Sequence, residues 1–405
     1  MLNNKSKIVL ALYVLVMVLL PFSRLSELPI LILSIIGIIG LLKNWQTLIK
    51  QARFRTLSVV YLSYLFMVLL SASDSYWQDK TLIVAISSIR FYLATIALIC
   101  YLRPAQFVQF IRIITILLIF WAVDAMIQYF FGVDLLARSS YPGRLNGIFG
   151  QHHVKLGPVL ALLLPIAIIG LQKSQALLRW SSIFVIIITI LLSGTRSAWL
   201  MMLFTLLAYW WHHVKQRRLQ LLLKTSIAAV VMLFSLWFIS PDFQQRINRS
   251  MAIFQGTEQG IDFALANRLE IWSSAWQMFV HHPINGIGAH AFRKAYGDYA
   301  QANDSWQQQG GVGMHAHHWL LEILAETGII GLLLMLFAIV QLVRFIQKNY
   351  NSSYSWAFLI ALIAAFLPIT STYSIFASFW SICIWFIGAG LLVVSHKDDK
   401  HESEI

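Results

Sequence analysis

Two arginines and a histidine cluster are the residues whose types and spacing are typical of chemistry on a phosphate-bearing substrate. The first arginine is in Ser-Gly-Thr-Arg-Ser at residues 193–197, where glycine and hydroxyl residues favour a tight turn before a helix. Arg196 then falls in the first helical turn, where a cation is unfavourable unless an anion is bound. An arginine that reaches phospholipid headgroups is the alternative interpretation.

A second arginine stands at the start of a predicted amphipathic helix. Asn267 can cap this helix, with Glu270 three residues later as in a capping box. An apolar stripe at helical spacing predicts packing on the membrane or on other helices; it comprises Leu269, Trp272, Trp276 and Phe279. Arg268 again lies in the first turn, and two such arginines suggest one shared anion. A diphosphate fits, because guanidinium groups bind phosphate oxygens bidentately.

The histidine cluster lies where a polar segment returns to an apolar run. It reads Met-His-Ala-His-His-Trp at residues 314–319, and ten residues separate His317 from Gly328 in a Gly-x-x-Gly pattern. A neutral histidine there can accept a proton from a hydroxyl group. A zinc site and an interfacial cluster without chemistry are the alternatives.

Further polar residues near the same membrane face are candidates for substrate binding. Arg90 lies deep in an apolar run, where a charge costs about 2.5–3.5 kcal/mol on insertion scales, so it should face the bundle interior or an anionic ligand. Glu326 lies in the apolar run after the histidines, where a carboxylate requires a partner or a function. The predicted substrate-binding residues are Lys80, Arg90, Arg144, His315, His318 and Glu326.

Apolar helices must position all of these residues. Hydrophobic residues make up 59% of the 405 residues and charged residues only 12%, which excludes a soluble globular protein. The apolar runs predict an all-α polytopic membrane protein with about twelve transmembrane helices. The predicted spans are 8–22, 29–42, 56–72, 82–102, 107–131, 154–171, 176–193, 197–213, 219–239, 319–343, 354–370 and 373–395.

The basic residues predict the orientation of these spans. The formal net charge is +13, but the Lys and Arg residues gather at span ends, which indicates topology rather than nucleic-acid binding. Both termini are then cytoplasmic. Residues 1–239 form nine spans with short loops, and residues 240–318 form one large, mainly helical periplasmic loop. Residues 319–405 form three further spans and a short cytoplasmic tail.

The three motifs, in this order and on one side of the membrane, resemble the O-antigen ligase family (WaaL type) of the O-antigen ligase and polymerase superfamily. The family pattern is a Thr-Arg-Ser/Ala turn, an Arg-Leu-x-x-Trp/Tyr helix in a large periplasmic loop, and a histidine ten residues before Gly-x-x-Gly. Here the matching residues are Thr195-Arg196-Ser197, Arg268-Leu269 with Trp272, and His317 with Gly328 and Gly331. The family usually has Asn, Ser or Gln after the histidine, whereas this chain has His318; counting back from Gly328 selects His317.

The resemblance implies a glycosyltransferase of the bacterial inner membrane with a site facing the periplasm. It would take a glycan from undecaprenyl diphosphate and place it, with inversion, on a sugar hydroxyl of lipid A–core. His317 would act as the general base, and Arg196 and Arg268 would stabilise the diphosphate leaving group. The expected partners are these two lipid substrates and membrane lipids, with no nucleic acid, metal or other cofactor. The alternatives are an O-antigen polymerase, a protein O-oligosaccharyltransferase of the same superfamily, and a polysaccharide transporter or flippase.

Overall fold

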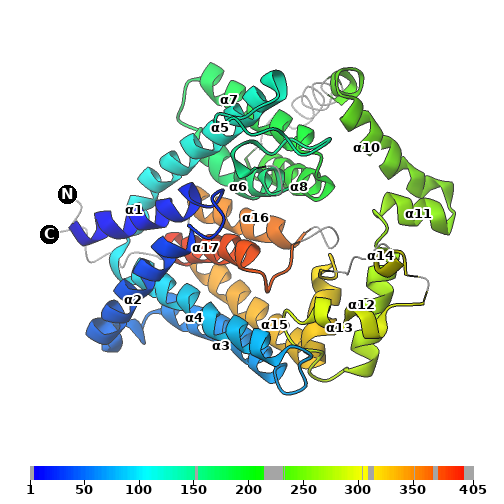
Figure 1. Cartoon of the computed structure of the whole chain (residues 1–405). Helices are drawn as coiled ribbons and strands as arrows, with labels where there is room; N and C mark the ends of the chain where they lie inside the picture. Colours follow the sequence, from blue (N-terminus) through cyan, green and yellow to red (C-terminus); the bar gives the residue numbers. More distant parts are fainter. Residues whose placement is uncertain are drawn as a thin grey trace. The chain divides into compact units, whose positions relative to one another are not determined.

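The helices carry most of the residues that the structure, a computed structural model, describes (Figure 1). These are residues 4–150, 154–213, 231, 233–302, 304–308, 314–350, 352–367 and 373–395. Isolated β bridges pair Val133 with Ser139 and Tyr141 with Arg144.

The α-helices are α1 (Asn4–Val18), α2 (Glu27–Leu48), α3 (Ala52–Leu70), α4 (Gln78–Tyr101), α5 (Phe107–Phe131), α6 (Leu156–Gly170), α7 (Ala176–Leu192), α8 (Arg196–His213), α10 (Pro241–Met251), α11 (Glu258–Ala264), α12 (Leu269–His281), α13 (Phe292–Tyr299), α14 (Ser305–Gln308), α15 (Trp319–Asn349), α16 (Ser353–Phe366) and α17 (Ser378–Val394). Short 3-10 helices are η1 (Pro104–Gln106), η2 (Gly147–Phe149) and η3 (Ala252–Gln255).

Among the described residues, five helical segments are long and apolar enough to cross a membrane: α2, α3, α4, the continuous segment Pro104–Phe131, and α15. Shorter apolar helices accompany them, namely α6, α7, α16 and α17. Large apolar side chains lie exposed along these helices, as Leu31, Ile35 and Leu42 do on α2. Such a surface is unfavourable in water and ordinary against lipid tails. The predicted all-helical membrane protein is therefore confirmed, whereas the number of spans and the sidedness of the large polar segment stay predictions.

The helices coincide with the predicted spans wherever the structure describes them. Each predicted span up to 197–213, and each from 319–343 onwards, contains a helix. The predicted span 219–239 lies largely outside the described residues, although 233–239 is helical. The last helix begins at Ser378 rather than at residue 373, because a turn precedes it in which Ile375 N donates to Glu322 Oε2 at 3.3 Å.

The chain forms two compact units. Unit 1 comprises Met1–Ile114, Glu270–Leu362 and Ile369–Ile405, and unit 2 comprises Thr115–Leu269 and Ile363–Pro368. In unit 1, α2 and α3 pack on α4, and α15 packs on α3. In unit 2, α6, α7 and α8 pack on one another, and α10 packs on η3 and α11. The polar segment 240–318 is thus divided between the two units at the start of α12.

Helix α15 is broken at Gly328, which has φ 61° and ψ −163°. The neighbouring segment 283–288 replaces the helical hydrogen bonds that this break removes. The bonds are Ile287 N to Ala325 O (2.9 Å), Gly288 N to Glu326 O (3.0 Å), Ile329 N to Pro283 O (2.9 Å) and Ile330 N to Ile284 O (3.1 Å). Backbone groups that would cost free energy in apolar surroundings are thereby paired. The break also explains the first glycine of the Gly-x-x-Gly pattern.

We expect Gly328→Ala to lower the free energy of unfolding by about 2 kcal/mol or more, because φ is left-handed and the backbone is crowded. A Cβ at this position would lie 2.3 Å from Ile284 O. Thermal unfolding of the purified protein in detergent measures the effect. Gly388→Ala in α17 is the matched control, since no atom lies within 4 Å of its added Cβ. Equal melting temperatures for the two variants would contradict this account of the break.

Candidate functional site

The Ser-Gly-Thr-Arg turn joins α7 to α8 and contacts α10 through two arginines. Gly194 has a positive φ of 65°, and a Cβ on it would lie 2.2 Å from Arg246 Nε. Arg196, the first residue of α8, donates from Nη1 to Ser250 Oγ at 3.3 Å and to the carbonyl oxygen of Ala264. The glycine is therefore required by the close approach of an arginine, and the turn fixes α10 and α11 beside α8.

Two further arginines lie in the same part of unit 2. Arg249 of α10 donates from Nε to Phe263 O at 2.7 Å, and its guanidinium carbon lies 4.6 Å from the centre of the Phe263 ring. Arg268 directly precedes α12. Burial, and then the positive charges of Arg196, Arg144 and Arg249, lower the pKa of Arg268 to about 10.

Arg144 belongs to a loop that two polar side chains of α5 fix in place. The carboxylate of Asp124 accepts hydrogen bonds from Leu135 N (2.9 Å) and Ile148 N (2.6 Å). Gln128 Oε1 accepts from Gly147 N at 2.8 Å. From the other side, Arg246 Nη2 of α10 donates to Gly143 O at 2.6 Å. This loop therefore carries Arg144 to the arginines of α8 and α10.

We call these residues the arginine cluster: Arg144, Arg196, Arg246, Arg249 and Arg268. The pKa of Arg246 is lowered to about 10 by burial and by Arg144, Arg196 and Arg249, while the carboxylate of Asp242 opposes that shift. Gathering like charges in partly buried surroundings is unfavourable, and a phosphate-bearing ligand would relieve it. The structure thus brings together three arginines predicted from the sequence, and it adds Arg246 and Arg249. Their spacing of three residues on one helix was the signal available for finding them.

The histidine cluster lies in unit 1, in the segment that enters α15. The rings of His315 and His317 have centroids 3.8 Å apart, and His317 has a left-handed φ of 52°. Trp272 Nε1 of α12 donates to Ala316 O at 3.1 Å, which fixes this segment on α12. His318 caps α15, because its Nδ1 accepts from Leu321 N at 3.2 Å.

His290, which sequence reasoning missed, is a fourth histidine in this region. Its pKa is lowered to about 4, first by burial and then by the positive charges of Lys80, Arg293 and His315. The carboxylate of Glu326 accepts hydrogen bonds from His290 N (2.6 Å) and Phe292 N (3.0 Å). The structure therefore gathers three predicted residues around an unpredicted one. In the sequence, His290 is a single histidine in Gly-Ile-Gly-Ala-His, a pattern without a chemical signature.

Arg90 has a protein partner. Its Nε lies 2.7 Å from Glu27 Oε2, and its Nη2 donates to Ser378 Oγ at 3.1 Å. It also lies ten residues after Lys80 on α4, which is about 15 Å along a helix. Of the two environments expected for this charge, the protein interior and an anionic ligand, the ion pair favours the interior.

Helix α12 begins where the sequence predicts, but Glu270 has a different partner from the predicted one, and a face other than the predicted stripe is buried within the protein. Glu270 does not form the predicted capping box, because its Oε2 accepts from Ser305 N at 3.0 Å, and Asp262 Oδ1 accepts from Leu269 N at 3.0 Å. The buried residues are Ile271, Ser274, Ala275 and Met278. Trp276 of the predicted stripe remains 49% exposed. The face of α12 with the smaller side chains is buried within the protein, because it packs on Phe292 and Tyr296 of α13.

Zinc was one alternative for the histidine cluster. Across the part of the chain that the structure describes, no three His, Cys, Asp or Glu side chains are grouped to hold a metal ion. Independence from metals stays a prediction.

These features define a helical membrane protein with a cluster of partly buried arginines suited to a phosphate-bearing ligand. Residues 181–336 match the protein family described as O-antigen ligase. The matched stretch runs from α7 into α15 and includes Arg196, Arg268 and His317. The predicted resemblance to the O-antigen ligase and polymerase superfamily is therefore confirmed. A comparison with curated proteins gives no match.

The lowered pKa of His290 predicts how stability responds to acid. Between about pH 6.5 and pH 4, the unfolded chain binds a proton on this side chain that the folded chain does not. The corresponding stability is fully present above pH 6.5 and is lost as the pH falls towards 4. We expect His290→Asn, which tolerates the left-handed φ of 66°, to lose less melting temperature than the unsubstituted protein between pH 7 and pH 5.

His281→Asn is the control for this measurement, because His281 is an exposed histidine at the end of α12. It should retain the acid response of the unsubstituted protein. An identical acid response in all three proteins would show that His290 titrates normally.

Proposed function

We propose that this protein is an O-antigen ligase of the bacterial inner membrane. It transfers a glycan from undecaprenyl diphosphate to a sugar hydroxyl of lipid A–core at the periplasmic face. All members of the arginine cluster except Arg144 lie inside the family-matched stretch, and this is the observation that carries the proposal, because a polyprenyl diphosphate is the anion that such a donor supplies. The proposed sidedness places both termini in the cytoplasm and segment 240–318 in the periplasm.

Arg196 and Arg268 stabilise the departing diphosphate in this proposal. As the bond between the anomeric carbon and the phosphate oxygen breaks, negative charge grows on the diphosphate. Guanidinium groups already held in place stabilise that charge without reorganisation, which is the largest source of catalysis in many enzymes. Arg144 contributes to binding the same group. The contacts of Arg196 with Ser250 and Ala264 support this role, because they fix the guanidinium before the donor arrives.

His317 accepts the proton of the acceptor hydroxyl, whose oxygen then forms the new bond to the anomeric carbon on the face opposite the diphosphate. The geometry of the cluster supports His317 over His318, since the cap of α15 occupies Nδ1 of His318. His315 lies against His317 and Lys80 lies near His290, and both contact the acceptor in this proposal. Glu326 acts through the backbone of His290 and Phe292, which it positions.

We expect Arg196→Ala, Arg268→Ala and His317→Ala each to reduce glycan transfer at least 100-fold, because each removes a group that acts on the reacting atoms. Transfer from a purified undecaprenyl-diphosphate glycan to lipid A–core, in detergent, measures this. Arg112→Ala is the control for the loss of an arginine, because Arg112 is exposed on α5. Undiminished transfer by His317→Ala would overturn the proposed base.

A deletion strain separates the ligase from other members of the superfamily. Loss of a ligase should leave lipopolysaccharide without O-antigen while long polymer accumulates on the lipid carrier. Loss of a polymerase should instead leave single repeat units on lipopolysaccharide. Unchanged lipopolysaccharide together with unglycosylated membrane proteins would identify a protein O-oligosaccharyltransferase. Electrophoresis of lipopolysaccharide and mass spectrometry of the carrier lipid distinguish these outcomes.

A further inference from the structure

Helix α10 has two polar faces with different chemistry. One face contacts the arginine cluster: Arg246 donates to Gly143 O at 2.6 Å, and Ser250 Oγ accepts from Arg196 at 3.3 Å. The adjacent face follows helical spacing through residues 241, 244, 245, 248, 249 and 252, and it lines a pocket of about 490 Å³. One helix thus borders both the arginines and this pocket.

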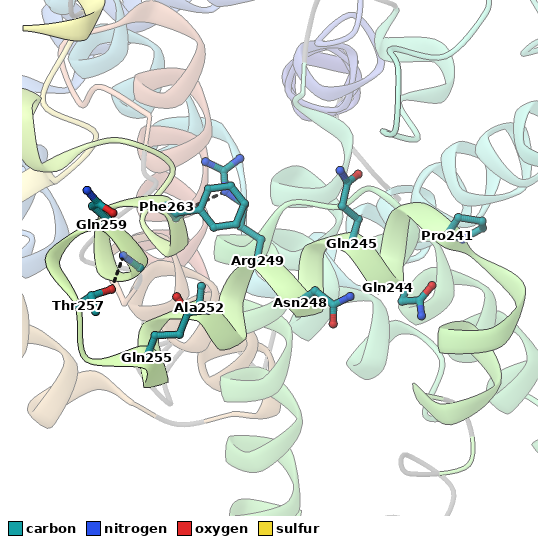
Figure 2. A pocket seen from close by; sticks show the side chains of 11 residues that line it. Pro241, Gln244, Gln245, Asn248, Arg249, Ala252, Gln255, Thr257, Gln259 and Phe263 are labelled. Carbon is teal, nitrogen blue, oxygen red and sulfur yellow. Dashed lines mark hydrogen bonds between the residues drawn. The ribbon is translucent and has the colours of Figure 1, made fainter.

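The pocket has an unusual concentration of carboxamide side chains. Its α10 wall carries Gln244, Gln245 and Asn248, and Figure 2 shows them along the helix beside Arg249. The facing wall, from η3 and α11, carries Gln255, Gln259, Thr257 and Phe263. The Thr257 hydroxyl caps α11 by accepting from Gly260 N at 3.1 Å, so this wall is ordered by its own helix start.

This lining matches a neutral ligand with many hydroxyl groups. Each carboxamide offers one acceptor oxygen and two N–H donors, and a sugar hydroxyl both donates and accepts. Phe263 is 52% exposed and adds an apolar ring, against which the C–H face of a sugar can lie. The volume falls within the range of about 300–1,000 Å³ that is usual for small-molecule sites, which gives room for a short run of sugars.

Arg249 is the charged residue among those that line the pocket, and its guanidinium is already engaged. It donates to Phe263 O at 2.7 Å, and it lies over the Phe263 ring. A densely anionic ligand would therefore bind more favourably at the arginine cluster than in this pocket. Arg249 belongs to both the arginine cluster and the pocket lining, so the pocket adjoins the cluster.

We propose that this α10–α11 pocket is a glycan subsite, which binds the sugars of the donor next to its diphosphate. The inference rests on the proposed function, because a lipid-linked glycan joins a diphosphate directly to sugars, which carry many hydroxyl groups. A ligand of that composition requires two adjoining environments, one cationic and one rich in amides. The two neighbouring faces of α10 supply them.

Binding of a free glycan tests the pocket without any transfer reaction. The probe is the O-specific polysaccharide released by mild acid from lipopolysaccharide of the bacterium that carries this chain, so it contains no diphosphate. Saturation-transfer NMR with the full-length protein in detergent should detect binding. The double variant Gln245→Ala/Asn248→Ala should bind at least fivefold more weakly. Both residues are exposed on a helix, and alanine favours the helix, so the variant should fold.

Gln277→Ala is the matched control, because Gln277 is an exposed glutamine on α12 outside the pocket. Its affinity should stay within twofold of the unsubstituted protein. Equal glycan affinity in the double variant and the control would overturn the subsite, as would absence of binding to the unsubstituted protein.

Transfer kinetics separate failure of the subsite from failure of the proposed function. With a donor that carries several repeat units, the double variant should show a KM at least fivefold higher and a kcat within twofold. A protein that binds the free glycan but transfers none would refute the ligase and leave the subsite standing. Normal transfer by a double variant with unchanged KM would refute the subsite and leave the ligase standing.

Discussion

Repulsion between guanidinium groups is the constraint on which the organisation of unit 2 depends. Five arginines come from α8, α10, the loop before η2 and the residue before α12, and burial together with their neighbours lowers the pKa of Arg246 and Arg268 to about 10. Such a cluster destabilises the protein unless other contacts offset it. Here carbonyl and hydroxyl oxygens accept from the guanidinium groups, and Gly194 makes room for one of them. A bound diphosphate would turn this unfavourable charge into binding energy.

Unit 1 depends on a different constraint, the pairing of backbone groups where α15 is broken. A helix in apolar surroundings cannot lose hydrogen bonds without replacement. Segment 283–288 supplies them, and the carboxylate of Glu326 fixes the residues that follow. The same contacts set the position of His290, while α12 fixes His315 and His317 through the carbonyl of Ala316. The Gly-x-x-Gly pattern and the histidines are thus parts of one local structure rather than independent motifs.

The sequence predicts the features that depend on local periodicity and composition, and it misses those that depend on tertiary contacts. Apolar runs locate the helices, since the backbone N–H and C=O groups of each run must form hydrogen bonds within it. Arg196, Arg268 and His317 stand out because their local patterns recur in a family. The three-residue spacing of Arg246 and Arg249 is only a weak local signal, and His290 has none, so their place in the site becomes clear when distant segments meet. The predicted capping box of α12 is wrong for the same reason, because Glu270 accepts from Ser305, whereas packing of the predicted stripe on the membrane stays a prediction.

The proposed reaction gives a reason why the guanidinium groups and the carboxamide side chains lie on neighbouring faces of α10. A transferase must release the diphosphate after the glycan has moved to its acceptor. If the sugars were bound by charged side chains, the affinity of the glycan would change as the charge of the leaving group grew and departed. Neutral carboxamides bind hydroxyl groups with an energy that depends little on neighbouring charge. In the proposed reaction, a pocket of this kind would hold the glycan while the arginines act on the diphosphate, and two faces of one helix would supply both environments.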